Sequence, residues 1–187
     1  MLYHASPTPD IKILTPHASN HGVPLIYLSS KRENVLVYLS NAVEKCCREK
    51  GFTHNGSYRK WATYGFNKEG LLQLQEYYPN ATEDTYKGIS GYIYTVNEDV
   101  RFKPMEDIPF AFACSTPVPV TSCEQIPDAY EALISAADAG KIELTSYQQN
   151  SEQKLKWIET VIRKEYEKYQ NDPDYRFFLE TKFSFLR

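Results

Sequence analysis

The chain has 187 residues, of which 42% are hydrophobic, and its 21 lysines and arginines against 24 aspartates and glutamates give a formal net charge of −3. This length is typical of one domain, and it allows roughly 70% of the unfolded surface to be buried. The charge balance disfavours non-specific nucleic-acid binding, although a local basic patch could still hold a structured RNA or a nucleotide. No stretch approaches the ~18 to 20 apolar residues of a membrane helix, and the N-terminus has no signal-peptide pattern. We therefore expect a soluble, cytoplasmic protein without a membrane partner.

No internal repeat, low-complexity run or Gly/Ser-rich linker marks a domain boundary. The simplest organisation is a single domain over residues 1–187, with a core at 1–148 and C-terminal helices at 151–186 packed on that core.

The cysteines give no sign of a metal site, because no two of them have the spacing of a zinc knuckle. We expect no metal and reduced thiols in the core. The four cysteines are Cys46, Cys47, Cys114 and Cys123.

In the first half of the chain, strands are expected at Leu2–Ala5 and Pro24–Ser29, with a proline-punctuated loop between them. Apolar residues then recur every three or four positions from Arg32 to about Arg48, which predicts one amphipathic helix that ends before Gly51. Residues 61–66, 71–78 and 91–96 are rich in aromatic and β-branched side chains and predict three more strands.

In the second half, Ala111–Cys114 and Val118–Cys123 are expected to be strands, and a helix is expected to begin at Pro127 and end at Gly140. A strand at Ile142–Thr145 and two helices follow, at Glu152 to about Tyr169 and at Asp174–Phe185, parted by Pro173. This order predicts an α+β fold with a split, mainly antiparallel sheet, flanking helices and a C-terminal helical extension.

The C-terminal helices present an apolar stripe that is expected to pack on the sheet. An alternative is that their phenylalanines form a surface for a partner or for a homodimer. These residues are Phe177, Phe178, Phe183 and Phe185.

Residues suited to chemistry occur in a particular order along these elements. Tyr3-His4-Ala5-Ser6 lies on the first strand, Ile26-Tyr27-Leu28-Ser29-Ser30 ends the second, and Tyr38 follows about three helical turns later. This order resembles the diphtheria-toxin and poly(ADP-ribose) polymerase branch of the ADP-ribosyltransferases, which uses a His, a Tyr and a Glu. Members of that branch commonly carry Gly directly after the His, where this chain has Ala5.

The glutamate of that family lies on a late strand just before a helix. Ser122-Cys123-Glu124-Gln125-Ile126, followed by the helix expected from Pro127, resembles this junction, so Glu124 is the candidate. Glu98 and Glu143, near the ends of other strands, are the competing carboxylates.

The resemblance implies that NAD is the substrate and lies in a cleft between the halves of the sheet. It implies that Tyr27 and Tyr38 sandwich the nicotinamide ring, by cation–π attraction, and that Glu124 stabilises positive charge on the ribose. By the same resemblance His4 holds a ribose hydroxyl and the backbone of Ala5 holds the carboxamide.

Ser29 and Ser6 have supporting roles at most in this interpretation. Taken singly, each of these residues also has an ordinary structural interpretation: core aromatics for the tyrosines, a buried histidine for His4, and a charge near a helix N-terminus for Glu124.

The expected function is NAD-dependent mono-ADP-ribosyl transfer or NAD glycohydrolysis, with a protein side chain, a nucleic acid or water as the acceptor. One alternative is a non-catalytic protein that keeps the fold and binds a nucleotide or a partner. A second is a related RNA 2′-phosphotransferase-type enzyme. The sequence contains no P-loop, HExxH or GxSxG motif, which argues against P-loop nucleotide hydrolysis and against metal and serine hydrolases.

Overall fold

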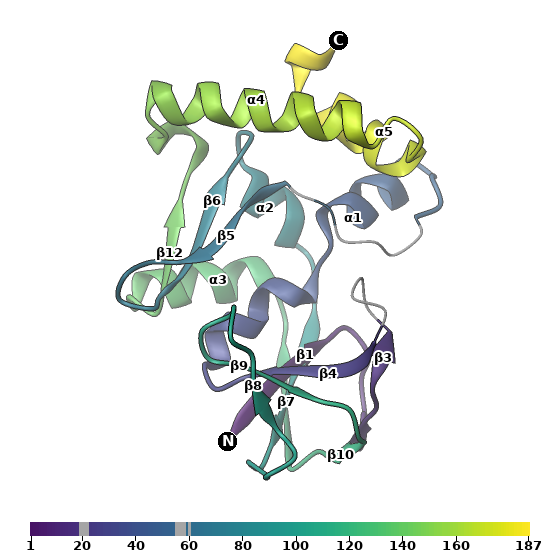
Figure 1. Cartoon of the computed structure of the whole chain (residues 1–187), viewed down its shortest axis with the longest axis vertical. Helices are drawn as coiled ribbons and strands as arrows, with labels where there is room; N and C mark the ends of the chain where they lie inside the picture. The colour runs from purple at the N-terminus through teal and green to yellow at the C-terminus, as the bar shows by residue number, and fades with distance from the viewer. Residues whose placement is uncertain (19–22, 55–58, 60) are drawn as a thin grey trace. The chain divides into compact units, whose positions relative to one another are not determined.

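The computed structural model describes residues 1–18, 23–54, 59 and 61–187 (Figure 1). The fold is α+β with an antiparallel sheet core, as the sequence predicts. The chain forms two compact units, each assembled from three segments. Unit 1 contains Met1–Ser40, Phe66–Leu72 and Tyr86–Glu143, and unit 2 contains Asn41–Gly65, Gln73–Thr85 and Leu144–Arg187. The units therefore do not divide the chain near residue 148, because the C-terminal helices group with earlier segments.

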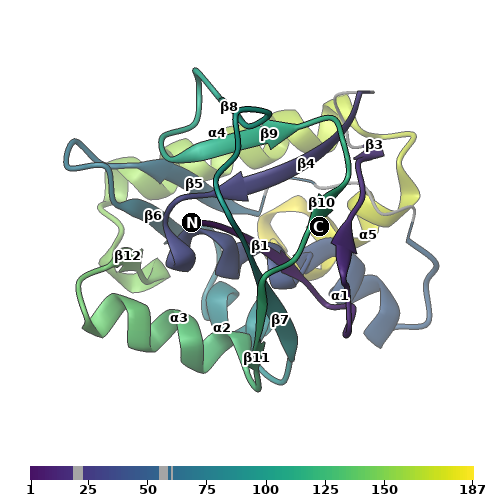
Figure 2. The same ribbon diagram turned by 90° about the horizontal axis from the view of Figure 1, so that it is seen from below.

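Unit 1 is built on a seven-stranded sheet with the order β11-β7-β1-β4-β9-β8, in which β3 also pairs with β4 (Figure 2). Every recorded pairing in it is antiparallel. The strands are β1 (Leu2–Ser6), β3 (His17–Ala18), β4 (Pro24–Ser29), β7 (Gly91–Val96), β8 (Lys103–Pro104), β9 (Ala111–Cys114) and β11 (Ser122–Ile126). The predictions for β1, β4, β7 and β9 are confirmed.

The strand predicted at Val118–Cys123 is two strands with different partners. β10 (Val118–Pro119) pairs with β2 (Ile13–Leu14), whereas β11 pairs with β7. Between them the backbone amide of Thr121 donates to the carbonyl of Thr95, at 2.8 Å. The prediction was wrong because an apolar run does not reveal where a chain changes its partner strand.

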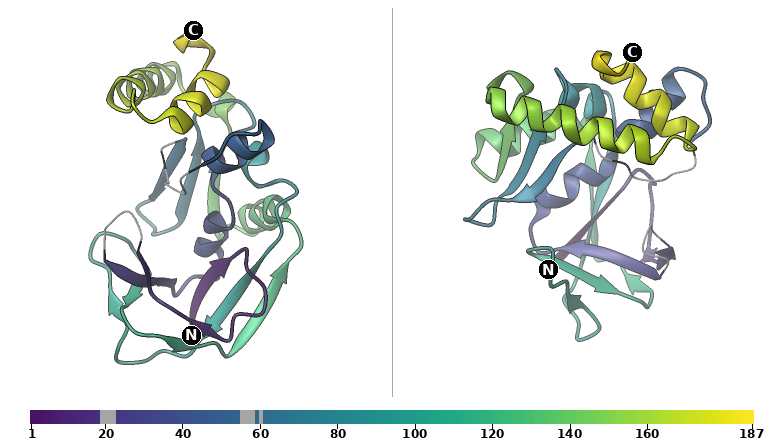
Figure 3. Two further views of the ribbon diagram at one scale, coloured as in Figure 1. Left: turned by 90° about the vertical axis from the view of Figure 1, so that its right-hand side faces the viewer. Right: turned by 45° about the horizontal axis from the view of Figure 1, so that its top comes forward.

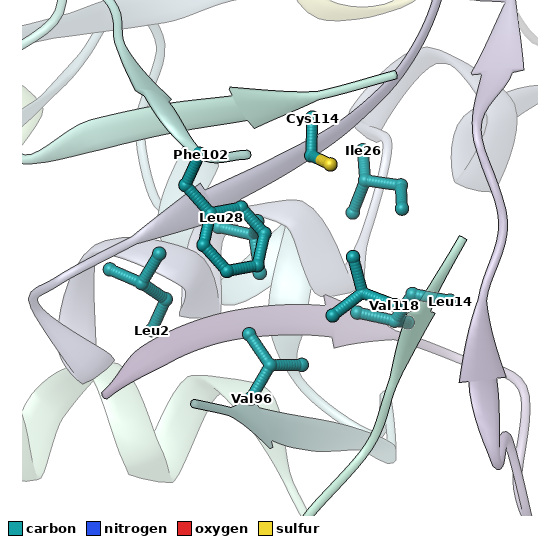
Figure 4. Packing of buried hydrophobic residues seen from close by; sticks show 8 residues of the cluster. All are labelled: Leu2, Leu14, Ile26, Leu28, Val96, Phe102, Cys114 and Val118. Carbon is teal, nitrogen blue, oxygen red and sulfur yellow. The ribbon is translucent and has the colours of Figure 1, made fainter. Parts of the chain in front are cut away.

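One face of the sheet carries an apolar cluster of unit 1 (Figure 4). Side chains alternate between the faces of a strand, so Ile26 and Leu28 of β4 meet Leu2 of β1 on this face. Every member of the cluster is at most 8% exposed. The cluster consists of Leu2, Leu14, Ile26, Leu28, Val96, Phe102, Cys114 and Val118.

The opposite face is covered by the 3₁₀ helix η1 (Arg32–Leu39), which contacts β1, β4 and β7, and α3 (Ala129–Asp138) contacts η1. Ala5 of β1 and Ile93 of β7 are register partners and are both buried there. A Cβ on Gly91, at the start of β7, would lie 2.6 Å from Leu39 Cδ2, so a larger residue there would force the Leu39 side chain to move. Thus η1 is seated directly on β1 and β7.

The single helix predicted from Arg32 to Arg48 is wrong. Residues 32–39 are the 3₁₀ helix η1, Ser40 is extended, and α1 runs over Ala42–Glu49. Asn41 begins α1, because its side-chain oxygen accepts hydrogen bonds from the amides of Val43 and Glu44 at 3.1 and 3.2 Å. This cap starts a new helix at the point where unit 1 gives way to unit 2 along the chain.

Unit 2 contains α1, α4 (Glu152–Lys168) and α5 (Pro173–Lys182), together with nearly all of α2 (Ala81–Tyr86). The helices α4 and α5 lie side by side in both views of Figure 3, and α5 also contacts α1. Most residues of a three-stranded sheet with the order β12-β6-β5 also belong to unit 2. Its strands are β5 (Ala62–Phe66), β6 (Leu72–Glu76) and β12 (Ile142–Thr145), and the short 3₁₀ helices are η2 (Tyr147–Gln149) and η3 (Ser184–Leu186).

The strands of this sheet, α3 and the two C-terminal helices confirm the sequence predictions, with shifts at the ends. Pro173 does not lie between the helices but is the first residue of α5, where Asp172 caps the helix by accepting from the amide of Tyr175. The helix α2 was not predicted. Its first turn is held by Glu76, which accepts from the amide of Thr82 at 2.8 Å.

Two expectations about apolar and sulfur side chains need correction. Phe178 and Phe183 are at most 2% exposed within unit 2, so they do not form a surface for a partner. Phe177 stacks on Phe52, with ring centroids 4.3 Å apart. All four cysteines are free thiols, and Cys123 is exposed on β11 whereas the other three are buried.

No helix in the described part of the chain combines the length and the apolar character that crossing a bilayer requires.

Candidate functional site

The candidate site lies in unit 1, where the central strands β1 and β4 separate. All five residues of β1 pair with β7, from Leu2 with Val96 to Ser6 with Tyr92. In the described residues, the register between β1 and β4 is the single pair Tyr3 with Ser29. Next to this pair, a side chain rather than the backbone connects the two strands: His4 Nδ1 lies 2.8 Å from the carbonyl oxygen of Tyr27. We call this place the β1–β4 seam.

The hydrogen bond at the seam defines the protonation of His4. Because a carbonyl oxygen only accepts, His4 Nδ1 carries the proton and Nε2 is left as an acceptor. Burial lowers the pKa of His4 from its ordinary value of 6.5, the bond to Tyr27 opposes this effect, and the nearby His17 adds to it. Histidine 4 is therefore neutral in the folded protein at neutral pH.

We expect the half-buried, neutral His4 to make stability depend on pH. Its pKa is lower in the folded state, so the unfolded state binds more protons as the pH falls below the unfolded value of 6.5. The free energy of unfolding should therefore decrease between about pH 7 and pH 5.5. Urea unfolding at the two pH values should show a smaller decrease in the free energy of unfolding for His4→Asn than for the wild-type protein. Asparagine keeps a hydrogen-bond donor but cannot titrate. Equal decreases in both proteins would show that His4 is not protonated more readily on unfolding.

The predicted aromatic residues lie on β4 and on η1, which contacts β4. Tyr27 is half-buried, and strand alternation places Tyr27 and Ser29 on the face opposite to the apolar cluster. Ser29 is buried, and its hydroxyl oxygen accepts from the amide of Lys31 at 3.0 Å. Tyr38 lies on η1 and is 55% exposed as a residue, but burial around its hydroxyl raises the pKa of Tyr38, so the ring is only partly open to solvent.

Glu124 lies on β11, at the edge of the sheet, and is held by an arginine that the sequence did not indicate. Arg32 Nε donates to Glu124 Oε2 at 2.8 Å, and Arg32 Nη2 donates to Oε1 at 2.5 Å. The two side chains are 29% and 51% exposed. The pair is 92 positions apart in the sequence, so no local pattern signals it.

The ion pair continues into a short row of alternating charges on η1 and beyond α3. Arg32 lies 3.8 Å from Glu33, and Glu33 accepts a hydrogen bond from Lys141 at 2.8 Å. Although partial burial opposes its ionisation, the contacts with Lys141 and Arg32 lower the pKa of Glu33. The row Glu124, Arg32, Glu33, Lys141 thus alternates acidic and basic side chains, two of each.

Strand register shows which candidates share a face. Glu124 is opposite Ile93, which is opposite Ala5, so Glu124 and Ala5 lie on the face that η1 covers. In the neighbouring row Cys123 is opposite Tyr94, which is opposite His4. Figure 2 shows the adjoining strands β11, β7 and β1 that carry both rows.

The structure therefore brings five candidates to one side of the sheet and leaves His4 at the seam. Ala5, Tyr27, Ser29 and Glu124 are on the η1 face, and η1 itself carries Tyr38. By alternation along β1, His4 belongs to the other face, and its ring reaches the backbone of Tyr27.

The two competing carboxylates have other partners. Glu98, which follows β7, accepts a hydrogen bond from the amino group of Met1 at 2.7 Å. Glu143 on β12 accepts from the side-chain amide of Asn67 at 3.1 Å.

Comparison of the chain with models of protein families, with curated proteins and with solved structures finds no match. The resemblance to ADP-ribosyltransferases thus rests on the residues named above. Among the residues that the structure describes, no three or more His, Cys, Asp or Glu side chains gather into a group suited to a metal ion.

Proposed function

We propose that unit 1 binds NAD and breaks its nicotinamide–ribose bond, and that it transfers ADP-ribose to an acceptor or to water. The observation that carries the proposal is the grouping of Tyr27, Glu124 and Ala5 on one face of the sheet, beneath the helix that carries Tyr38. These are residues for which the order of motifs implies a role at NAD.

The chemistry needs a fixed negative charge. The bond between ribose C1′ and the pyridine nitrogen breaks, its electron pair stays on the nitrogen, and nicotinamide leaves as a neutral base. Positive charge then develops on the ribose until an acceptor oxygen bonds to C1′ and releases its proton. A carboxylate about 4 Å away stabilises that charge by roughly 4 kcal/mol at an effective dielectric of 20, which is about a thousandfold in rate. Glu124 takes this role.

The neutral state of His4 suits a binding role. His4 Nδ1–H donates to the Tyr27 carbonyl. Although His4 belongs to the other face of the sheet, its ring lies at the β1–β4 seam, so a ribose hydroxyl that reaches the seam donates to Nε2, which has no partner among the described residues. Tyr27 and Tyr38 supply the aromatic faces for the pyridinium ring.

Replacing Tyr38 by alanine should weaken NAD binding and leave the fold intact. The ring is 55% exposed, so its removal takes away little packing. The lost cation–π attraction of about 0.5 to 2 kcal/mol corresponds to a roughly 2- to 30-fold higher Kd. Calorimetric titration with NAD measures the Kd, and thermal unfolding provides the check. A large drop in Tm with an unchanged Kd would place the ring in the core rather than at the ligand.

The direct test of the function is incubation with NAD and detection of free nicotinamide. Release without an added acceptor is expected if water serves as acceptor, and ADP-ribose should appear in equal amount. If no nicotinamide appears with water, protein or RNA as acceptor, although NAD binds, catalysis is ruled out and binding remains.

One observation favours that second function, nucleotide binding without catalysis. Arg32 holds the Glu124 carboxylate through both oxygens and cancels its charge. If this pair persists with NAD bound, the site lacks the uncompensated charge that bond cleavage needs.

A further inference from the structure

The ion pair between Arg32 and Glu124 is a feature that the motif resemblance does not account for. We propose that Arg32 binds the phosphates of a nucleoside diphosphate, and that Glu124 pairs with the Arg32 guanidinium only while no such ligand is bound. The choice of a nucleoside diphosphate as the ligand rests on the proposed function. The proposal that a ligand anion replaces Glu124 on Arg32 does not rest on it.

A phosphate group can form the same two contacts with Arg32 as the Glu124 carboxylate. Arg32 uses two nitrogens, Nε and Nη2, on the two oxygens of Glu124. This planar fork matches two oxygens of a phosphate as well as it matches a carboxylate. A diphosphate brings more negative charge than a single carboxylate, so it competes favourably for the same donors.

The pair is accessible and replaceable. Its side chains are 29% and 51% exposed, and exposed ion pairs contribute little to stability. The neighbouring Glu33 does not take over Arg32, because Glu33 is 3.8 Å from Arg32 but holds Lys141 at 2.8 Å. A ligand anion can therefore displace Glu124 without exposing a buried charge.

The same 3₁₀ helix has an unsatisfied donor. Asn34, two positions after Arg32, is 8% exposed, and its Nδ2 has no hydrogen-bond partner among the described residues. Buried donors are normally paired. Thus η1 carries, besides Arg32, a buried donor without a partner among the described residues.

The exchange would couple binding to chemistry. While Arg32 holds Glu124, the carboxylate charge is cancelled; when the diphosphate holds Arg32, that charge is available to the ribose. Substrates without a diphosphate, such as nicotinamide riboside, should then be cleaved poorly even at saturation.

The test measures binding of ADP and of inorganic pyrophosphate, which contain no nicotinamide–ribose bond, by calorimetry at constant ionic strength. Arg32→Gln should raise the Kd for both at least tenfold, and Arg32→Lys should raise it less, because lysine keeps the charge but loses the fork. Glu124→Gln should lower the Kd several-fold, because it removes the competing carboxylate. Thermal unfolding should show that each variant is folded.

A matched pair in the same unit provides the control. Arg101 also contacts both carboxylate oxygens of Asp99, at 3.0 and 2.9 Å, and these side chains are 41% and 35% exposed. Arg101→Gln and Asp99→Asn should leave ADP binding unchanged.

Three results would overturn the proposal: no binding of ADP or pyrophosphate to the wild-type protein, an unchanged Kd in Arg32→Gln, or weaker binding in Glu124→Gln. The proposed function is judged separately, by nicotinamide release. If the expected changes in Kd occur without any release, Arg32 binds phosphate and catalysis is absent. If nicotinamide is released while Arg32→Gln binds ADP normally, catalysis holds and the role of Arg32 is wrong.

Discussion

Replacing Glu124 by glutamine is expected to lower kcat for nicotinamide release several-hundred-fold without weakening NAD binding. Glutamine is nearly isosteric and still forms hydrogen bonds, but it carries no charge to stabilise the ribose in the transition state. The expected loss is about 3 to 4 kcal/mol, and it falls on kcat because the charge acts mainly when positive charge develops. Steady-state release of nicotinamide gives kcat, and calorimetry gives the Kd.

The matched controls are Glu98→Gln and Glu143→Gln, whose carboxylates bind Met1 and Asn67. Both variants should release nicotinamide at nearly the wild-type rate. If Glu124→Gln retains full release and one of the controls loses it, the functional carboxylate lies on another strand. If all three remain fully active, no carboxylate mechanism operates.

Replacing Leu2 by alanine is expected to destabilise the protein by about 2 to 5 kcal/mol, the range for buried Leu→Ala changes. Leu2 has no exposed surface and lies in the apolar cluster between Val96 and Leu28 (Figure 4). Its removal leaves a cavity beneath the strand that carries His4. Denaturant unfolding followed by circular dichroism measures the change.

The control for Leu2→Ala is Ile13→Ala, since Ile13 belongs to the same unit but is 55% exposed. We expect this variant to change the free energy of unfolding by about 0.5 kcal/mol or less. Similar losses in the two variants would mean that the cluster is not tightly packed around Leu2.

Local patterns predicted most of the strands and helices. The runs at β4 and β7 have strong β-formers, and Gly140 ends α3 with a φ of +67°, a value that favours glycine. The broken helix could have been found: Asn41 followed by Glu44 is a helix-start signal, which the continuous apolar periodicity concealed. The apolar positions that form the predicted stripe are buried in both η1 and α1. The periodicity therefore predicted the buried positions correctly but the type of helix incorrectly.

Features that depend on distant residues had no local signal. The helix α2 is held at its start by Glu76 of the preceding strand, and its short sequence contains three β-branched or aromatic residues among six. For the site, the motif order identified strands that the sheet brings together, but the alternation that separates His4 from Glu124 required the register of three strands. Nothing in the sequence pointed to Arg32, which is identified only by its contact with Glu124 in the structure.

The strand order also decides when unit 1 can form during synthesis. The N-terminal strand β1 lies in the middle of the sheet, and its main partner, β7, follows ~90 residues later. At translation rates of about 5 to 20 residues per second, β1 waits on the order of 5 to 20 s before β7 exists. Such long-range pairing slows folding. The nascent chain therefore carries the apolar Leu2, and the edge of β1 that later pairs with β7, without their partners through much of its synthesis.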